Sequence, residues 1–131
     1  MVEDKQLDFK VWQDDNGIVI GEILTRMDLE ASERFIKEML EATRSVKRKV
    51  KVFIDISKTP GNPSIRSRKL FIGFGKELKI DRLAVFGFDT LKRVMANFIM
   101  AAIGEKILKE NVREMKFFGN KEEALKWLKE E

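Results

Sequence analysis

VKVFIDIS, residues 50–57, is a short apolar run rich in β-branched side chains. Charged residues precede it, and a stretch containing Pro60, Gly61 and Pro63 follows it. A run of this length between such flanks is typical of a buried β-strand. We therefore place a central strand at residues 50–56.

The residues before this strand predict a β-hairpin and a helix. Leu7, Phe9 and Val11 alternate with polar residues, residues 14–17 (DDNG) supply turn chemistry, and the alternation resumes over residues 18–24. Asp28 is a typical N-cap residue. The apolar positions after it recur every three or four residues, as in a helix with one buried face: Leu29, Phe35, Ile36, Met39, Leu40 and Thr43.

The residues after the central strand predict three helices that alternate with two strands. Pro63 ends the irregular stretch, and Ser64 caps a helix that extends to about residue 78. A strand over residues 83–86 leads to a long helix from Asp89 or Thr90 to about residue 109. A last strand at residues 112–118 precedes a terminal helix capped by Asn120.

Strands that are joined by helices of this length must lie parallel. The predicted fold class is therefore α/β, with a mostly parallel sheet of about five strands, an N-terminal β-hairpin and about four covering helices. With 131 residues, 44% of them hydrophobic, and no break in composition, the chain is expected to form one domain over residues 1–131.

Composition limits the location and the chemistry of the protein. It has no cysteine, residues 1–10 lack an apolar run, and the longest apolar stretch, residues 98–103, is far shorter than the ~20 residues of a membrane span. We therefore expect a cytoplasmic protein. The absence of histidine and cysteine excludes Ser-His and Cys-His nucleophile pairs and ordinary zinc sites, and no P-loop or paired-carboxylate spacing occurs. We expect no catalytic residue, metal or cofactor, and hence no enzyme.

Polar residues follow the predicted parallel strands, and such residues converge at one edge of a sheet. The binding candidates at that edge are Asp55, Ser57, Thr59, Ser64, Arg66, Arg68, Asp89 and Thr90. The helix start at Ser64, with Arg66 and Arg68, suits a phosphate or a carboxylate. Alternatively, Ser64 and Asp89 only cap helices, the arginines face solvent, and Asp55 anchors its loop by accepting backbone N–H bonds.

Residues 94–103 are apolar almost all round, whereas a helix that covers a sheet needs only one apolar stripe. The apolar residues outside such a stripe predict a dimer contact or a cavity for an apolar ligand, and burial by a neighbouring helix is the alternative. The candidate residues are Phe71, Phe74, Met95, Ile99, Met100 and Ile103.

Four segments together resemble the SpoIIAA-like family, which is related to the STAS domains and, in its divergent branch, to lipid-binding Sec14-type domains. They are residues 17–23 (GIVIGEI), 52–57 (VFIDIS), 80–87 (IDRLAVFG) and 117–128, which contain FF and EEALKWL. The resemblance implies a non-enzymatic switch or ligand-sensing domain whose binding face is the loop and helix start after the central strand. Anti-sigma antagonists carry Asp-Ser-Ser-Gly there, and of Asn62-Pro63-Ser64-Ile65 in this chain only Ser64 matches.

The expected function is therefore a non-catalytic regulatory or protein-binding module with an unidentified protein partner. The alternative is a carrier or sensor of a small lipophilic or anionic ligand. Nucleic acid is the less favoured partner although the isoelectric point is 9.3, because acidic residues are interleaved with the basic ones and no aromatic stacking motif is evident.

Overall fold

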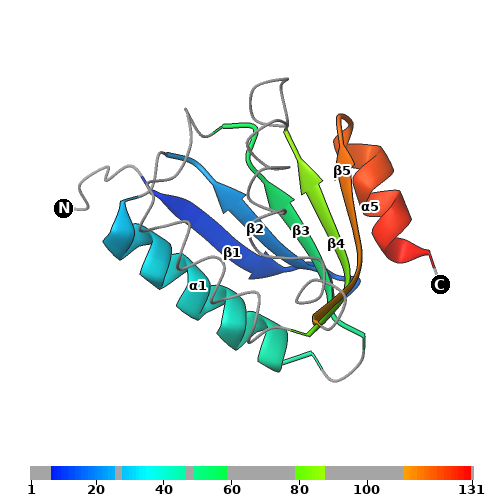
Figure 1. Cartoon of the computed structure of the whole chain (residues 1–131), viewed down its shortest axis with the longest axis horizontal. Coiled ribbons are helices and arrows are strands. Elements are labelled where there is room, and N and C mark those ends of the chain that lie inside the picture. The colour runs from blue at the N-terminus through cyan, green and yellow to red at the C-terminus, as the bar shows by residue number, and fades with distance from the viewer. Residues whose placement is uncertain (1–6, 26–27, 47–48, 59–78, 88–110, 131) are drawn as a thin grey trace.

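The computed structural model describes residues 7–25, 28–46, 49–58, 79–87 and 111–130 (Figure 1). These residues form, in chain order, β1 (Phe9–Gln13), β2 (Val19–Ile23), α1 (Leu29–Arg44), β3 (Lys51–Asp55), β4 (Ile80–Phe86), β5 (Val112–Phe118) and α5 (Lys121–Lys129). Only two of the about four expected helices lie in these residues. The other two, predicted over residues 64–78 and from residue 89 or 90 to 109, lie outside the described residues. None of the described helices is long and apolar enough to cross a membrane.

The five strands form one sheet in the order β1-β2-β3-β4-β5. β1 pairs antiparallel with β2, while β2, β3, β4 and β5 are parallel to one another. The mostly parallel sheet, its antiparallel edge and the central position of the VKVFIDIS strand are thus confirmed. The carboxyl ends of four parallel strands meet at one edge, which we call the carboxyl edge.

The turn between β1 and β2 is fixed by one aspartate and one glycine. The Asp14 carboxylate accepts hydrogen bonds from the N–H groups of Asn16 and Ile18, both at 2.9 Å. Gly17 has a φ of +80°, a conformation that residues with a side chain seldom adopt. The DDNG sequence therefore sets the register that continues as Phe9 opposite Ile23 and Gln13 opposite Val19.

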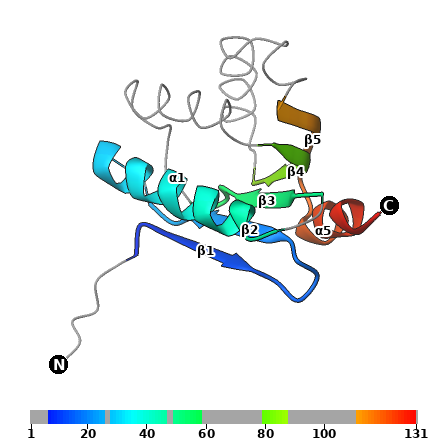
Figure 2. The ribbon, with the colours of Figure 1, turned by 90° about the horizontal axis from the view of Figure 1, so that it is seen from below.

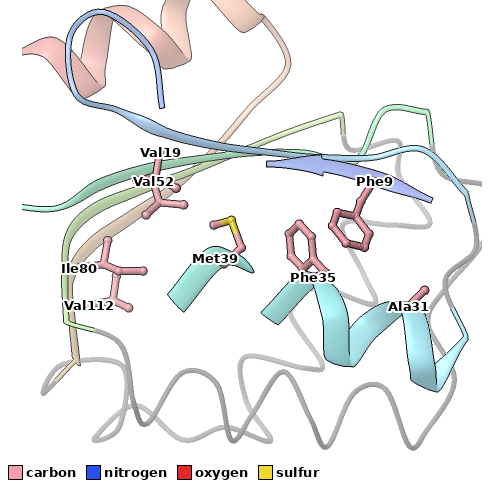
Figure 3. Packing of buried hydrophobic residues seen from close by; sticks show 8 residues of the cluster. All are labelled: Phe9, Val19, Ala31, Phe35, Met39, Val52, Ile80 and Val112. Carbon is pink, nitrogen blue, oxygen red and sulfur yellow. The ribbon is translucent and has the colours of Figure 1, made fainter. Parts of the chain in front are cut away.

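Helix α1 covers β1 and β2 on one face of the sheet. Asp28 caps the helix, as predicted, by accepting the N–H of Ala31 at 2.8 Å. Figure 3 shows Phe35 and Met39 pointing from α1 toward the sheet, and both are fully buried. Gly21 lets the helix approach this closely, because a Cβ at that position would lie 3.0 Å from the Phe35 ring. The cluster on this face consists of Phe9, Val19, Ala31, Phe35, Met39, Val52, Ile80 and Val112.

Helix α5 packs over β3, β4 and β5 on the other face. The Asn120 side chain caps it, as predicted, through the N–H of Glu123 at 3.1 Å. Its last turn is closed by Arg82, whose Nη1 donates to the carbonyls of Trp127 at 2.6 Å and Glu130 at 2.9 Å. The second core cluster consists of Ile18, Ile20, Phe53, Ala84, Ala124, Trp127 and Leu128.

Strand β4 begins at Ile80, three residues before the predicted start at residue 83. The charged pair Asp81 and Arg82 interrupts the apolar pattern, which is why the sequence alone placed the start too late. The N–H groups of both residues point at the carbonyl of Val50, at 2.7 and 3.4 Å, as at a β-bulge. The irregularity sends Arg82 toward α5, while Ile80 and Leu83 both face the α1 side.

Candidate functional site

Asp55 ends β3 at the carboxyl edge and is almost completely buried, with 4% of its surface exposed. One carboxylate oxygen, Oδ1, accepts the N–H of Ser57 at 2.8 Å and the Ser57 hydroxyl at 2.6 Å. This is the local side-chain to backbone bonding by which aspartate shapes turns. Asp55 therefore anchors the first residues of the loop, while Ser57 and Lys58 themselves are exposed.

The end of β4 holds the same loop from the other side. Gly87 has a φ of +105°, and a Cβ at this position would overlap the backbone nitrogen of Ser57. The N–H of Ile56 donates to the carbonyl of Phe86 at 2.9 Å, which extends the β3–β4 ladder past Asp55. Only glycine allows this close approach, so the position of Ser57 is fixed by both strands.

Glu22 on β2 is a second buried carboxylate at this edge. It lies opposite Asp55 in the β2–β3 register, and 8% of its surface is exposed. Its Oε1 lies 3.4 Å from Nζ of Lys58, whose side chain is 58% exposed. The lysine compensates part of the cost of burying the carboxylate, although solvent screens a pair that is this open.

Sequence reasoning missed Glu22 and Lys58 as site residues. The signal was present, since a glutamate interrupts the apolar residues near the end of a strand that neighbours β3. What was lacking was the register, because only the pairing of Glu22 with Asp55 shows that the two carboxylates share one edge. We call Glu22, Asp55, Ser57 and Lys58 the polar edge site.

The polar edge site offers one hydrogen-bond acceptor and one cation to a partner. The Ser57 hydroxyl proton is directed at Asp55, so its oxygen remains able to accept, while the Lys58 ammonium group is the accessible donor. Across residues 7–25, 28–46, 49–58, 79–87 and 111–130, no three His, Cys, Asp or Glu residues gather as metal ligands would. The arrangement is suited to recognition through hydrogen bonds and charge.

The start of α5 adds a second basic group near this edge but does not form an anion site. Lys121 Nζ lies 6.0 Å from the centre of the Phe53 ring. The first turn, however, contains Glu122 and Glu123, whose negative charges oppose an anion at the positive end of the helix dipole.

Of the predicted site residues, the structure brings Asp55 and Ser57 together. The other polar candidates, Thr59, Ser64, Arg66, Arg68, Asp89 and Thr90, lie outside the described residues. The same holds for every candidate of the predicted apolar contact: Phe71, Phe74, Met95, Ile99, Met100 and Ile103.

Comparisons with known proteins agree with this architecture. The model of the SpoIIAA-like family matches residues 17–129, which include every described element except β1. Among solved structures, the chain is similar to the crystal structure of an uncharacterized protein of the DUF3478 family with a SpoIIAA-like fold from Shewanella loihica PV-4. The two are 21% identical, the match covers 92% of this chain and 91% of that chain, and the TM-score is 0.62. No curated protein matches the sequence. On the extent of the family match, the chain belongs to the SpoIIAA-like family.

Proposed function

We propose that the chain is a non-catalytic regulatory module that binds a partner protein at the polar edge site. The observation that carries the proposal is the double anchoring of Ser57, by the Asp55 carboxylate and by the backbone of Gly87. A surface loop that is already held in place loses little conformational entropy when a partner binds. Ser57 is thus presented in a fixed position, and Lys58 follows it in the chain as an exposed cation.

The composition of the chain supports binding over catalysis. The whole sequence lacks histidine, cysteine and tyrosine, which removes the usual general bases and activated thiols. The two buried carboxylates of the polar edge site are already engaged, Asp55 by Ser57 and Glu22 by Lys58. These contacts support a structural role for the two carboxylates in holding the loop after β3.

The first experiment is native mass spectrometry of the protein isolated from its own cells. A co-purifying polypeptide, identified and then prepared in pure form, supports the proposal. A retained small molecule instead supports the alternative function, a carrier or sensor of a lipophilic or anionic ligand. Turnover of a substrate by the purified chain contradicts both.

The second experiment locates the binding surface by reversing one charge. Lys58→Glu should weaken binding of the purified partner by about tenfold, which corresponds to about 1.4 kcal/mol. Lys49→Glu is the matched control, because Lys49 is exposed just before the opposite end of β3 and undergoes the same charge change. Lys58→Met removes the cation without placing a second carboxylate beside Glu22. Weaker partner binding by this variant, with folding retained, therefore reports loss of the lysine contact and not loss of folding. Equal affinity of all variants would remove the polar edge site from the interface.

A further inference from the structure

We propose that two copies of the chain join their sheets through β1, antiparallel and about a twofold axis. β1 is the outermost strand of the sheet, and among the described residues no strand lies beyond it (Figure 2). An edge strand carries main-chain N–H and C=O groups that another strand can pair with.

The hydrogen bonds to β2 show which main-chain groups of β1 face outward. The N–H of Asp14 donates to the carbonyl of Ile18 at 3.0 Å, and the N–H of Leu24 donates to the carbonyl of Asp8 at 2.9 Å. In an antiparallel pair the bonded residues alternate along each strand. The even-numbered residues of β1 therefore face β2, and the N–H and C=O groups of Phe9, Val11 and Gln13 face outward.

Two exposed large apolar side chains lie in β1 or just before it. Among the described residues they are Leu7, which is 55% exposed, and Trp12, which is 40% exposed. Phe9 and Val11 belong to the cluster under α1, so the alternation of a strand places Lys10 and Trp12 on the opposite face. On that face α5 packs over β3, β4 and β5, away from the Trp12 side of β1.

Charge selects both the partner and the register. With Trp12 opposite the partner's Trp12, Lys10 of each copy lies opposite the partner's Asp14, and Val11 lies opposite the partner's Gln13. Centring the pair on Lys10 would bring two ammonium groups together, and centring it on Val11 would place Asp8 opposite the partner's Asp14. A register centred on Phe9 would place Lys10 opposite the partner's Asp8, but that carboxylate already binds Arg34, and the two indoles would lie apart. Of these registers, only the one centred on Trp12 both pairs opposite charges and brings the indoles together.

Self-complementarity of this kind is the property of a twofold interface, in which the same patch occurs on both copies. A lysine on an edge strand ordinarily discourages pairing, but in this register Lys10 gains a carboxylate. β1 has only five residues, so the contact is narrow. We therefore expect a weak dimer, with a dissociation constant on the order of micromolar.

Sedimentation velocity over a wide range of protein concentration tests the dimer. The decisive variant is Gln13→Pro, because the Gln13 N–H faces outward and its loss leaves the β1–β2 ladder intact. It should weaken self-association by at least about tenfold, whereas Gln13→Ala, which keeps the N–H, should not. Lys10→Glu should also weaken the dimer, and Lys10→Arg should preserve it. Circular dichroism and thermal unfolding of each variant establish that it folds.

The proposal has clear opposing outcomes. A wild type that stays monomeric at all concentrations overturns it, as does a dimer that Gln13→Pro and Lys10→Glu leave unchanged. A dimer that Met100→Glu abolishes and Gln13→Pro does not would place the interface at the apolar residues 94–103 instead. Lys58→Glu should leave the dimer intact, so failure here is distinguishable from failure of the proposed function.

Discussion

Arg82 is a buried cation that closes the C-terminal end of α5, and its replacement by methionine should destabilise the fold. The residue is 9% exposed. Its guanidinium donates to the carbonyls of Trp127 and Glu130 and lies 5.2 Å from the centre of the Trp127 ring. Positive charge at this position also complements the negative end of the helix dipole.

The magnitude follows from opposing contributions. A hydrogen bond to a charged group contributes about 1.5–3 kcal/mol, and stacking on an indole adds about 0.5–2 kcal/mol. Against these, Nε of Arg82 is buried without a partner, which costs about 1–3 kcal/mol. After the loss of Arg82, the Glu130 carbonyl keeps its bond to Lys51 Nζ, and the Trp127 carbonyl keeps its bond to the Glu130 N–H. We therefore expect Arg82→Met to lower the free energy of unfolding by about 2 kcal/mol.

Urea unfolding followed by circular dichroism measures this change. With a slope of about 2 kcal/mol per molar urea, the midpoint should fall by about 1 M. Lys116→Met is the matched control, since Lys116 Nζ lies 5.1 Å from the same ring but is exposed, and its loss should cost at most about 1 kcal/mol. An unchanged or higher midpoint for Arg82→Met would show that the cost of desolvating the guanidinium equals or exceeds the stabilisation from its hydrogen bonds.

Two further predictions concern the start and the end of β4. The hydrogen bond from Arg113 holds the pKa of Asp81 below its usual range. The ionised carboxylate therefore stabilises the fold at pH values above about 3.9, the usual pKa of Asp in an unfolded chain. This stabilisation is lost as the pH falls through the lower pKa of the folded state. Asp81→Asn should therefore be less stable than wild type at pH 7, with a difference that shrinks below about pH 4 in urea titrations; a constant difference would refute this. Gly87→Ala should lower the free energy of unfolding by more than about 2 kcal/mol and release Ser57, because the new Cβ would overlap the Ser57 backbone. Gly119→Ala is the control: a Cβ there has nothing within 4 Å, so the change should be nearly neutral in the same thermal unfolding assay. Equal melting temperatures for the two glycine variants would contradict the close contact.

Local signals were sufficient to predict most of the described fold. Asp28 and Asn120 are caps that act through their own side chains within three residues, so the sequence alone identifies them. The DDNG turn is equally local, because Asp14 and Gly17 supply its bonds and its backbone conformation. The parallel order of the strands then follows from the lengths of the connections.

The start of β4 and half of the polar edge site depended on contacts between distant residues. Arg82 is compatible with a buried strand only because α5 offers it carbonyl groups, and the first of these, at Trp127, lies 45 residues later in the chain. Glu22 became a site residue only through its register with Asp55. A polar residue in a strand is penalised by local propensity, and only the tertiary partner decides whether the penalty is offset.

The same partners explain why the basic composition of the chain is weak evidence for a nucleic-acid ligand. Arg34 pairs with Asp8, Arg113 with Asp81 and Glu114, and Lys58 with Glu22, while Arg82 and Lys51 bond to carbonyls at the end of α5. A basic side chain that binds a phosphate releases counterions condensed on the nucleic acid, and a side chain that already has an acidic or carbonyl partner gains less from this exchange. Several of the basic side chains behind the isoelectric point of 9.3 are thus already used within the described part of the domain. At the polar edge site only a fixed hydroxyl and a lysine shared with Glu22 remain, an arrangement too sparse for a phosphate track.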